Sequence, residues 1–384
     1  MTARDSLDVC FLVNHLDTGG AQTLLRNIVE LDDRPNVTYT VCYAGSADEL
    51  AEEFRALGVD VVDLGARTEP PQFDPRPVLR TVRYFGKREF DVVHAHLPYA
   101  SVLGRIAGNR SDAAVVTTHH SISENYHPIE RTLERTTRSY NDATVYVSEA
   151  VADSFDGRSG APKLTIYNGI DSAAFESSVQ AADSEGLRAE LDVGDDTLAL
   201  NVGHCIEEKR QLDLVRAVDH LADDDPGVHV AIVGDGPERS ALEHAVRERN
   251  LGDHVSVVGR VPASEIHRYY AAADVYAQVS VYEGMPMTLL EAMSAGLPIV
   301  GTDVPGIAEF VEDGETGRVV PVASPAAIAG ALSSLDESQR RRMGQTCSDR
   351  VAERYDIDRA VEAYHTLYED LTSEPTVERG AVTR

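Results

Sequence analysis

The 384 residues are too many for one ordinary core and predict two domains, while a hydrophobic content of 42% excludes a wholly disordered chain. No apolar run approaches the roughly 20 residues of a membrane span, the start shows no signal-peptide pattern, and the four cysteines are scattered, so we expect a cytoplasmic protein without a disulfide framework. The net charge of -29 argues against nucleic acid as the main partner, and only three lysines among 35 basic residues favour a halophilic source.

The first half of the chain alternates short β-branched runs with helical patterns. Residues 8–14 are predicted to form a strand that leads through a Gly-containing turn into a helix at 23–31. Further strands are predicted at 38–45, 59–65, 90–96, 113–120 and 142–148. Near-continuous apolar strands that alternate with helices are typical of a parallel sheet covered on both faces.

The second half repeats this alternation after a change in composition. Residues 171–186 are small, polar and acidic, and we interpret 173–186 as a linker. Strands are then predicted at 197–205, 228–236, 254–260 and 274–280, with helices at 211–221, 238–249 and 263–273. The sequence therefore predicts an α/β protein with two Rossmann-like domains, residues 1–172 and 187–355, that face each other across a deep cleft.

The segment "VYEGMPMTLLEAMSAG", residues 281–296, carries two acids. Pro286 excludes one continuous helix through both, so we expect a loop that contains Glu283, followed by a helix that contains Glu291 and ends at Gly296. Free N–H groups at the helix start favour an anion such as phosphate, and two carboxylates are good acceptors for sugar hydroxyls. The alternative is that both acids are ordinary solvated residues.

Basic and histidine residues supply further candidates. Lys209 and Arg210 lie between a predicted strand and a predicted helix, where a lysine suits a phosphate group. The turn "VGDGP" (233–237) is more typical of a tight turn than of a dinucleotide site. His94 and His96 could be metal ligands on one strand, but the sequence offers no third ligand, so a zinc site is disfavoured.

Together these motifs resemble the retaining glycosyltransferases of family 4, which have the GT-B fold. The matching motifs, in the family's order, are "TGGAQ", "DVVHAH", "TTHH", "VSEA", "NGID", "VGHCIEEKR", "VGDGP" and "EGMPMTLLEAMSAGLPIVGTD". They extend essentially over residues 8–330. The pair of acids separated by seven residues is the most specific of them.

The resemblance implies a role for each matching residue at a nucleotide-sugar site. Glu283 would contact hydroxyls of the donor sugar, Glu291 the ribose, and Lys209 the diphosphate leaving group. His119 would point into the cleft near the reacting sugar, unless its neighbour His120 does so, because a strand turns only one of two successive side chains to each face. The backbone near the sugar and the diphosphate would be that of Gly284, Met285, Met287 and Thr288, with close approach at Gly19 and Gly20.

One position departs from the family pattern. His204 stands where family members commonly have an arginine that binds the diphosphate together with the lysine. A histidine lacks the planar fork of arginine, so donor binding would be weaker or Arg210 would take over the contact.

The resemblance also implies that residues 1–172 bind the acceptor and that residues 187–355 bind the donor. It implies that a C-terminal helix at about 356–372 packs back on the first domain, and that no metal is needed.

Basic residues lie on one face of a predicted helix and suggest a lipid-linked acceptor or contact with an anionic membrane at the inner face of the cell. They are Arg76, Arg80, Arg83 and Lys87, and Arg131, Arg135 and Arg138 repeat the pattern. The alternative for both helices is an ordinary solvated face.

Two other functions remain as alternatives to a retaining glycosyltransferase. One is a nucleotide-sugar 2-epimerase, and the other is a catalytically silent donor-binding subunit.

Overall fold

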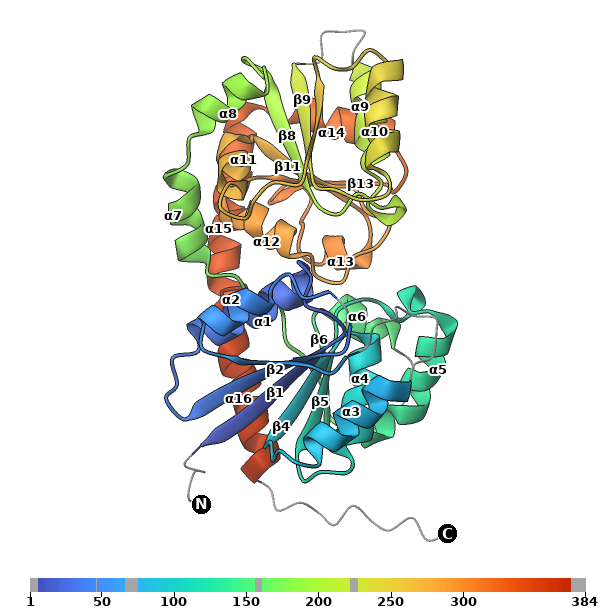
Figure 1. Ribbon diagram of the computed structural model, residues 1–384. Coiled ribbons are helices and arrows are strands. Elements are labelled where there is room, and N and C mark those ends of the chain that lie inside the picture. Colours follow the sequence, from blue (N-terminus) through green and yellow to red (C-terminus); the bar gives the residue numbers. More distant parts are fainter. Residues whose placement is uncertain (1–5, 46, 66–74, 156–160, 222–226, 374–384) are drawn as a thin grey trace. The chain divides into compact units, whose positions relative to one another are not determined.

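The computed structural model describes residues 6–45, 47–65, 75–155, 161–221 and 227–373. The chain divides into two units (Figure 1). The first unit comprises Met1–Asn168 and Ile357–Arg384, and the second comprises Gly169–Asp356. The first unit ends slightly before the expected boundary at residue 172 because Ile170 donates its main-chain N–H to Tyr355 O and is thereby tied to the second unit.

A seven-stranded sheet with the order β3-β2-β1-β4-β5-β6-β7 forms the centre of the first unit, and its neighbouring strands are parallel. Its strands are β1 (Leu7–Val13), β2 (Val37–Tyr43), β3 (Asp60–Asp63), β4 (Val92–His96), β5 (Ala114–His119), β6 (Ala143–Tyr146) and β7 (Lys163–Thr165). The strand order reverses between β1 and β4. In open parallel sheets, ligands bind beside the carboxyl ends of the strands at such a switch point.

Helices flank both faces of this sheet (Figure 1). They are α1 (Gly20–Leu31), α2 (Ala51–Ala56), α3 (Pro75–Phe85), α4 (Pro98–Gly108), α5 (Pro128–Thr137), α6 (Glu149–Ser154) and α16 (Ile357–Ser373), with 3-10 turns η1 (Ser123–Asn125) and η2 (Arg138–Tyr140). Proline at the start of α4 and α5 fits the first turn of a helix, where a backbone N–H has no intrahelical partner.

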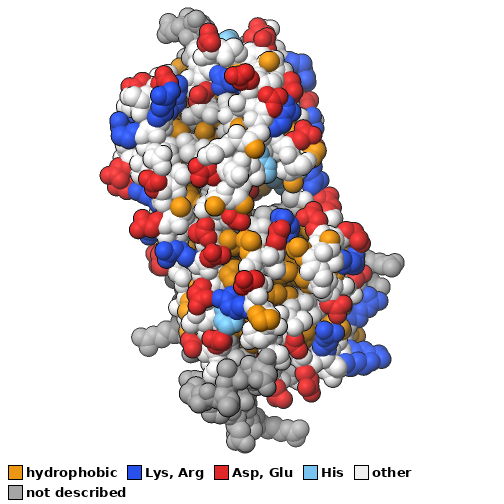
Figure 2. All heavy atoms as spheres, turned by 90° about the vertical axis from the view of Figure 1, so that its left-hand side faces the viewer, with side chains coloured by type: hydrophobic (Ala, Val, Ile, Leu, Met, Phe, Trp, Pro, Cys, Tyr) orange, Lys and Arg blue, Asp and Glu red, His pale blue; other side chains and the backbone are white. Residues whose placement is uncertain are grey.

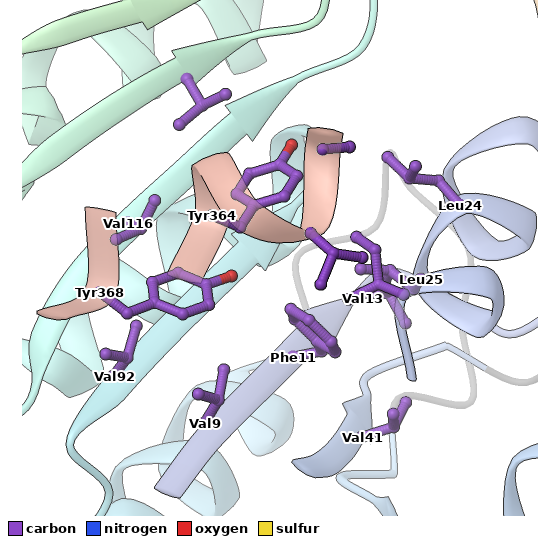
Figure 3. Close-up of a cluster of buried hydrophobic side chains, with 14 of the residues drawn as sticks. Val9, Phe11, Val13, Leu24, Leu25, Val41, Val92, Val116, Tyr364 and Tyr368 are labelled. Atoms are coloured by element: carbon purple, nitrogen blue, oxygen red, sulfur yellow. The ribbon is translucent and has the colours of Figure 1, made fainter. Parts of the chain in front are cut away.

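The C-terminal helix α16 completes the core of the first unit. Tyr364 and Tyr368 project from α16 and pack with Phe11, Val92 and Val116 of the strands (Figure 3). All five side chains are at most 2% exposed. The last helix is therefore part of the first unit's hydrophobic core, although the whole second unit separates it from the other elements in the sequence.

The second unit contains a six-stranded parallel sheet with the order β10-β9-β8-β11-β12-β13. Its strands are β8 (Thr197–Val202), β9 (Val228–Val233), β10 (Val255–Gly259), β11 (Val275–Gln278), β12 (Ile299–Thr302) and β13 (Gly317–Val320). The order reverses between β8 and β11, so the loops that follow these two strands lie at the switch point.

The helices of the second unit include several that the sequence analysis did not predict, among them α7 and α8. In chain order the helices are α7 (Ser172–Gln180), α8 (Ser184–Glu190), α9 (Gln211–Leu221), α10 (Arg239–Glu248), α11 (Ile266–Ala272), α12 (Met287–Ser294), α13 (Pro305–Ala308), α14 (Pro325–Ser334) and α15 (Glu337–Arg354), with the 3-10 turn η3 (Glu207–Lys209).

Helices α7 and α8 occupy most of the segment 173–186 that we interpreted as a linker. Asp171 Oδ1 accepts the N–H of Ala174 at 2.9 Å, and Asp183 Oδ1 accepts the N–H of Gly186 at 2.9 Å. These aspartates are helix N-caps, which use the same small and acidic residues that linkers do. Helix α7 packs against α11, α12 and α15, so the segment is a packed part of the second unit.

Acidic side chains are spread over the face of the molecule shown in Figure 2, interspersed with lysine and arginine. The net charge of -29 is thus distributed and does not mark one binding site on this face. Within the described ranges, no helix combines the length and the apolar character needed to cross a bilayer.

Candidate active site

Glu283 lies just beyond the end of β11, with a side chain that is only 9% exposed. Its Oε1 accepts three hydrogen bonds: from Lys209 Nζ at 2.6 Å, from Ser280 Oγ at 2.6 Å and from Gln278 Nε2 at 2.7 Å. The contact with the lysine ammonium is a charge-assisted hydrogen bond and therefore a strong one. The carboxylate is held in one place by its surroundings.

The loop after β8 brings Lys209 to this carboxylate. The loop forms the 3-10 turn η3, in which the N–H of Lys209 donates to Ile206 O. The N–H of Val281 donates to Glu208 O at 2.9 Å and joins this loop to the loop after β11. Lys209 and Glu283, 74 residues apart in the sequence, therefore meet at the switch point of the second sheet.

The segment from Glu283 to Gly296 has the predicted loop and helix. Pro286 is the N-cap residue, α12 begins at Met287, and Gly296 follows its end with φ +72°. The first turn contains no acidic side chain, so the positive end of the helix is not neutralised locally. Met287 is buried, like Met285, whereas Thr288 is partly exposed.

The backbone at Glu283 and Gly284 is closely covered by α13. A Cβ atom placed on Gly306 would lie 2.0 Å from the carbonyl oxygen of Glu283. Only a glycine fits there, because real Cβ atoms do not approach backbone oxygens so closely. The start of α13 thus fixes the loop that carries the carboxylate.

Glu291 lies on α12 and is bound by Tyr270 of α11. Tyr270 Oη donates to Glu291 Oε2 at 2.7 Å and lies 3.4 Å from the carbonyl oxygen of Thr288. Burial raises the pKa of Glu291, an effect that the hydrogen bond from Tyr270 opposes. This acid is therefore a positioned group and not a freely solvated one, which excludes the alternative interpretation for Glu291.

His204 and Arg210 lie in the same loop as Lys209 and differ in what they contact. The His204 side chain is exposed. Arg210 has φ +51°, and its Nε donates at 2.6 Å to Oδ2 of Asp213, whose side chain is 2% exposed. Arg210 is thus engaged by a buried acid, and the structure offers no support for it as a free substitute for the missing arginine.

The Gly-Asp-Gly turn at 234–236 packs against the loop that carries His204. A Cβ atom on Gly234 would lie 1.9 Å from Gly203 O, and one on Gly236 would lie 2.4 Å from Cys205 O. Both glycines have positive φ angles of +142° and +155°. The turn therefore supports the lysine loop, as expected for a tight turn.

In the first unit, Gly19 and Gly20 begin helix α1 beyond the end of β1. Gly19 is the N-cap residue, and the first turn of α1 contains no acidic side chain. A Cβ atom on Gly19 would lie 2.8 Å from Gln22 Oε1. The expected close approach of this backbone to the diphosphate stays a prediction.

His119 is buried inside the first unit. Its side chain is 1% exposed and packs against Phe155, with ring centroids 4.2 Å apart. Its Nδ1 lies 2.9 Å from Tyr126 Oη, and its Nε2 lies 3.9 Å from Glu134 Oε1. Burial, reinforced by the nearby positive charge of Arg105, holds the pKa of His119 well below its usual value. This histidine is therefore neutral in the structure, and its role near the reacting sugar stays a prediction.

His120 is the partly exposed histidine of the pair and follows the end of β5. Its Nε2 lies 2.9 Å from Nδ1 of the buried His96. His96 in turn packs against His94, whose Nδ1 lies 2.5 Å from Tyr368 Oη and whose Nε2 lies 2.6 Å from Thr118 Oγ1. Alternation along β5 thus turns His119 into the core and His120 toward the β4 histidines.

His94 is hydrogen-bonded by Tyr368 and Thr118, and His96 by His120. Among the residues that the structure describes, no three of His, Cys, Asp and Glu are grouped so as to hold a metal ion. Burial lowers the pKa of His94 to about 3 and that of His96 well below its usual value. These histidines act as neutral polar groups in the core.

The sequence analysis missed the polar residues that hold the two acids, namely Gln278, Ser280 and Tyr270. Gln278 and Ser280 occur two residues apart at the end of an otherwise apolar strand, directly before Glu283. Because side chains two apart share one face of a strand, this spacing is the signal that could have linked them to the carboxylate.

Two family models match the chain. The model for glycosyl transferases group 1 matches residues 183–350, and the model for glycosyltransferase family 4 matches residues 18–174. Together they span almost the whole described chain and meet near the boundary between the two units.

Characterised relatives and solved structures are similar over most of the chain. The GDP-mannose-dependent alpha-(1-6)-phosphatidylinositol monomannoside mannosyltransferase of Mycolicibacterium smegmatis is 28% identical over 84% of this chain and 87% of its own length. The alpha-monoglucosyldiacylglycerol synthase of Acholeplasma laidlawii is 27% identical over 62% of this chain and 65% of its own. The structure of HepE from Anabaena in complex with UDP superposes with a TM-score of 0.81 at 20% identity, covering 95% of this chain and 100% of that one. The predicted fold of two Rossmann-like domains, GT-B, is confirmed.

Proposed function

Because the chain belongs to the group 1 glycosyltransferases of family 4, we propose that it transfers a sugar from a nucleotide diphosphate sugar to a hydroxyl group of an acceptor and that the anomeric configuration is retained. The second unit would bind the donor and the first unit the acceptor. No metal is assigned a role in this proposal.

The observation that carries the proposal is the contact between Lys209 and Glu283 at the carboxyl ends of β8 and β11. At one switch point, Lys209 supplies a positive charge that can bind a diphosphate, and Glu283 supplies a carboxylate that can accept hydrogen bonds from sugar hydroxyls. The N-terminal end of α12, with no acid in its first turn, adds backbone N–H groups and a positive dipole end for the diphosphate. Glu291 on the same helix would accept hydrogen bonds from the hydroxyl groups of the ribose.

The proposed chemistry is a displacement on one face of the sugar. The acceptor oxygen forms its bond to the anomeric carbon while the bond from that carbon to the diphosphate oxygen breaks, and the acceptor's hydroxyl proton passes to the departing diphosphate. Lys209 and the start of α12 stabilise the charge that develops on the leaving group. From the first unit, the candidate contact is His119 or its partly exposed neighbour His120 at the end of β5.

The acceptor is proposed to be a sugar or a lipid-linked glycan, in glycolipid or surface polysaccharide synthesis. Two relatives carry names of enzymes that act on lipids. On α3 and just after it, Arg80, Arg83 and Lys87 are exposed and Leu79 is 67% exposed. Cationic and apolar side chains on one exposed helix suit a peripheral contact with an anionic membrane. The side chain of Arg76, at the start of α3, lies outside the described part of the chain.

A second surface of the first unit has the same character. On α5, Arg131 and Arg135 are exposed beside Ile129, which is 57% exposed, while Arg138 is partly buried. Glu134 is the buried residue of this helix. The outward side of α5 is therefore basic and apolar and would extend the proposed membrane contact of a cytoplasmic enzyme.

The test begins with a panel of UDP-, GDP- and ADP-sugars, screened by thermal shift in molar KCl, since a ligand that binds the native state raises its melting temperature. Transfer from the stabilising donor is then measured with wild type, Glu283→Ala and Lys209→Ala, with Glu207→Ala as the control on an exposed acid of the same loop. Loss of transfer in the first two variants alone supports the proposal. Conversion of the donor into its C2 epimer without any acceptor would favour a 2-epimerase, and donor binding without turnover would favour a silent donor-binding subunit.

A further inference from the structure

A buried chain of polar side chains leads to Glu283 from inside the second sheet. Tyr276 and Gln278 lie on one face of β11, and Ser280 follows two residues later. The three are at most 1% exposed. Burying a polar group costs free energy unless it is hydrogen-bonded. The hydrogen bonds of these three side chains therefore indicate their role in the structure.

The first contact in this chain orients the amide of Gln278. Tyr276 Oη lies 3.0 Å from Gln278 Oε1 and 3.1 Å from Val202 O, so its single proton is shared between two acceptors. With its oxygen at the tyrosine hydroxyl, the amide turns its NH2 group toward Ser280 Oγ at 2.8 Å and Glu283 Oε1 at 2.7 Å. The flipped amide would place its oxygen against the carboxylate and is excluded.

The second contact holds the carboxylate independently of Lys209. Oε1 of Glu283 accepts from Gln278 and Ser280 as well as from Lys209. When Lys209 turns to a diphosphate, two neutral donors still hold Oε1. In the described part of the chain the hydrogen bonds to Glu283 all go to Oε1, which leaves Oε2 as the acceptor for a hydroxyl of the donor sugar.

We propose that Gln278, oriented by Tyr276, is the positioning residue that fixes Glu283 for recognition of the donor sugar, as distinct from the nucleotide. This inference rests on the proposed function. Gln278 touches Glu283 and not the reacting atoms. Its effect should therefore appear in the affinity gained from the sugar and in kcat, and not in the affinity for the nucleotide diphosphate alone.

The experiment compares Gln278→Leu, which keeps the side chain's volume and removes the amide, with Asn201→Leu as a matched control. Asn201 is a buried amide on the neighbouring strand β8 whose Nδ2 donates to Ala277 O at 2.7 Å, and it does not contact Glu283. For each variant, calorimetry measures the affinity for UDP and UDP-glucose, or for GDP and GDP-mannose, whichever pair the wild type binds. Transfer assays on the same samples give kcat.

For Gln278→Leu we expect a nucleotide diphosphate affinity within about twofold of wild type, nucleotide-sugar affinity weakened about tenfold or more, and kcat reduced about 10- to 100-fold, the range for a lost hydrogen bond to a charged group. Asn201→Leu should affect the two affinities equally. Gln278→Glu places an acid beside Glu283, so its kcat should recover as the pH is lowered and the added acid becomes a donor.

Tyr276→Phe keeps the ring and removes only the hydroxyl, so it tests the same chain if Gln278→Leu does not fold. This variant should weaken the affinity for the nucleotide sugar, relative to that for the nucleotide diphosphate, about three- to tenfold, because the amide of Gln278 is no longer oriented. If wild type binds no nucleotide sugar, the proposed function fails and the positioning role with it. If wild type binds and transfers but Gln278→Leu and Tyr276→Phe behave like Asn201→Leu, only the positioning role is refuted.

Discussion

Lowering the pH from 7.5 to 5.5 should destabilise the first unit, because its sheet buries three neutral histidines. His94, His96 and His119 are at most 1% exposed. Burial lowers the pKa of all three, to about 3 for His94 and well below the usual value for the other two. In the unfolded chain each regains a pKa of about 6.5. Below that pH the unfolded state binds more protons than the native state, so stability present above pH 6.5 is lost as the pH falls.

The magnitude follows from proton linkage. A histidine that stays neutral in the native state and has a pKa of about 6.5 when unfolded lowers the free energy of unfolding by about 1.4 kcal/mol between pH 7.5 and 5.5. Three such residues together give about 4 kcal/mol, a large part of the roughly 5–15 kcal/mol that stabilises a typical domain. The sum counts only the fully buried histidines; burial also lowers the pKa of the partly exposed His120, to about 4, and this acts in the same direction.

The assay is urea unfolding at pH 7.5 and 5.5 in the same molar KCl, followed by circular dichroism. His119→Gln keeps an acceptor for Tyr126 and removes one titrating group. The difference in unfolding free energy between this variant and wild type should therefore shift by about 1.4 kcal/mol between the two pH values. His244→Gln, at a side chain that is 64% exposed on α10, is the control and should show no such shift. A pH-independent difference for His119→Gln would refute the reasoning.

Three further predictions concern the site and the surface of the first unit. Gly306→Ala should lower the free energy of unfolding by about 1–3 kcal/mol and weaken donor binding, because the added Cβ would lie 2.0 Å from Glu283 O. The control is Gly252→Ala, which has open space around its Cβ and should change neither the melting temperature nor donor binding. Glu291→Gln should weaken nucleotide diphosphate binding about 10- to 100-fold in calorimetry, and an unchanged affinity would contradict its ribose contact. Arg83→Glu should reduce co-sedimentation with vesicles that contain anionic lipid and leave transfer to a water-soluble acceptor unchanged, while equal loss with neutral vesicles would argue against an electrostatic contact.

The parts of the fold that follow from local patterns could be predicted from the sequence. Alternating apolar strands and amphipathic helices gave both parallel sheets, and Pro286 with Gly296 gave the loop and helix around the two acids. These features depend on residues that act on their own backbone, proline by fixing φ and glycine by permitting positive φ. The helices α7 and α8 were missed because Asp171 and Asp183 cap helices with side chains that are equally common in linkers.

Side-chain direction at the site could not be predicted in the same way. Strands of a parallel sheet are buried on both faces. The hydrophobicity of the sequence therefore does not show which of two successive side chains points to which face of the sheet. The resemblance therefore left His119 and His120 as alternatives, and the packing of His119 against Phe155 is seen only in the structure. The contact of Lys209 with Glu283 depends on the order of β8 and β11 in the sheet, which is a property of the whole fold.

The pairing of Lys209 with Glu283 explains how two charges that are largely shielded from water can be held ready for a ligand. Their side chains are 22% and 9% exposed, and a charge at such depth is unfavourable without a partner. In the structure each neutralises the other. In the proposed mechanism, Lys209 exchanges the carboxylate for a diphosphate and Glu283 exchanges the ammonium for a sugar hydroxyl. Gln278 and Ser280 stay on Oε1 throughout, so the carboxylate is never left without donors. Donor binding then replaces one set of satisfied contacts by another, and the binding energy remains available for orienting the sugar.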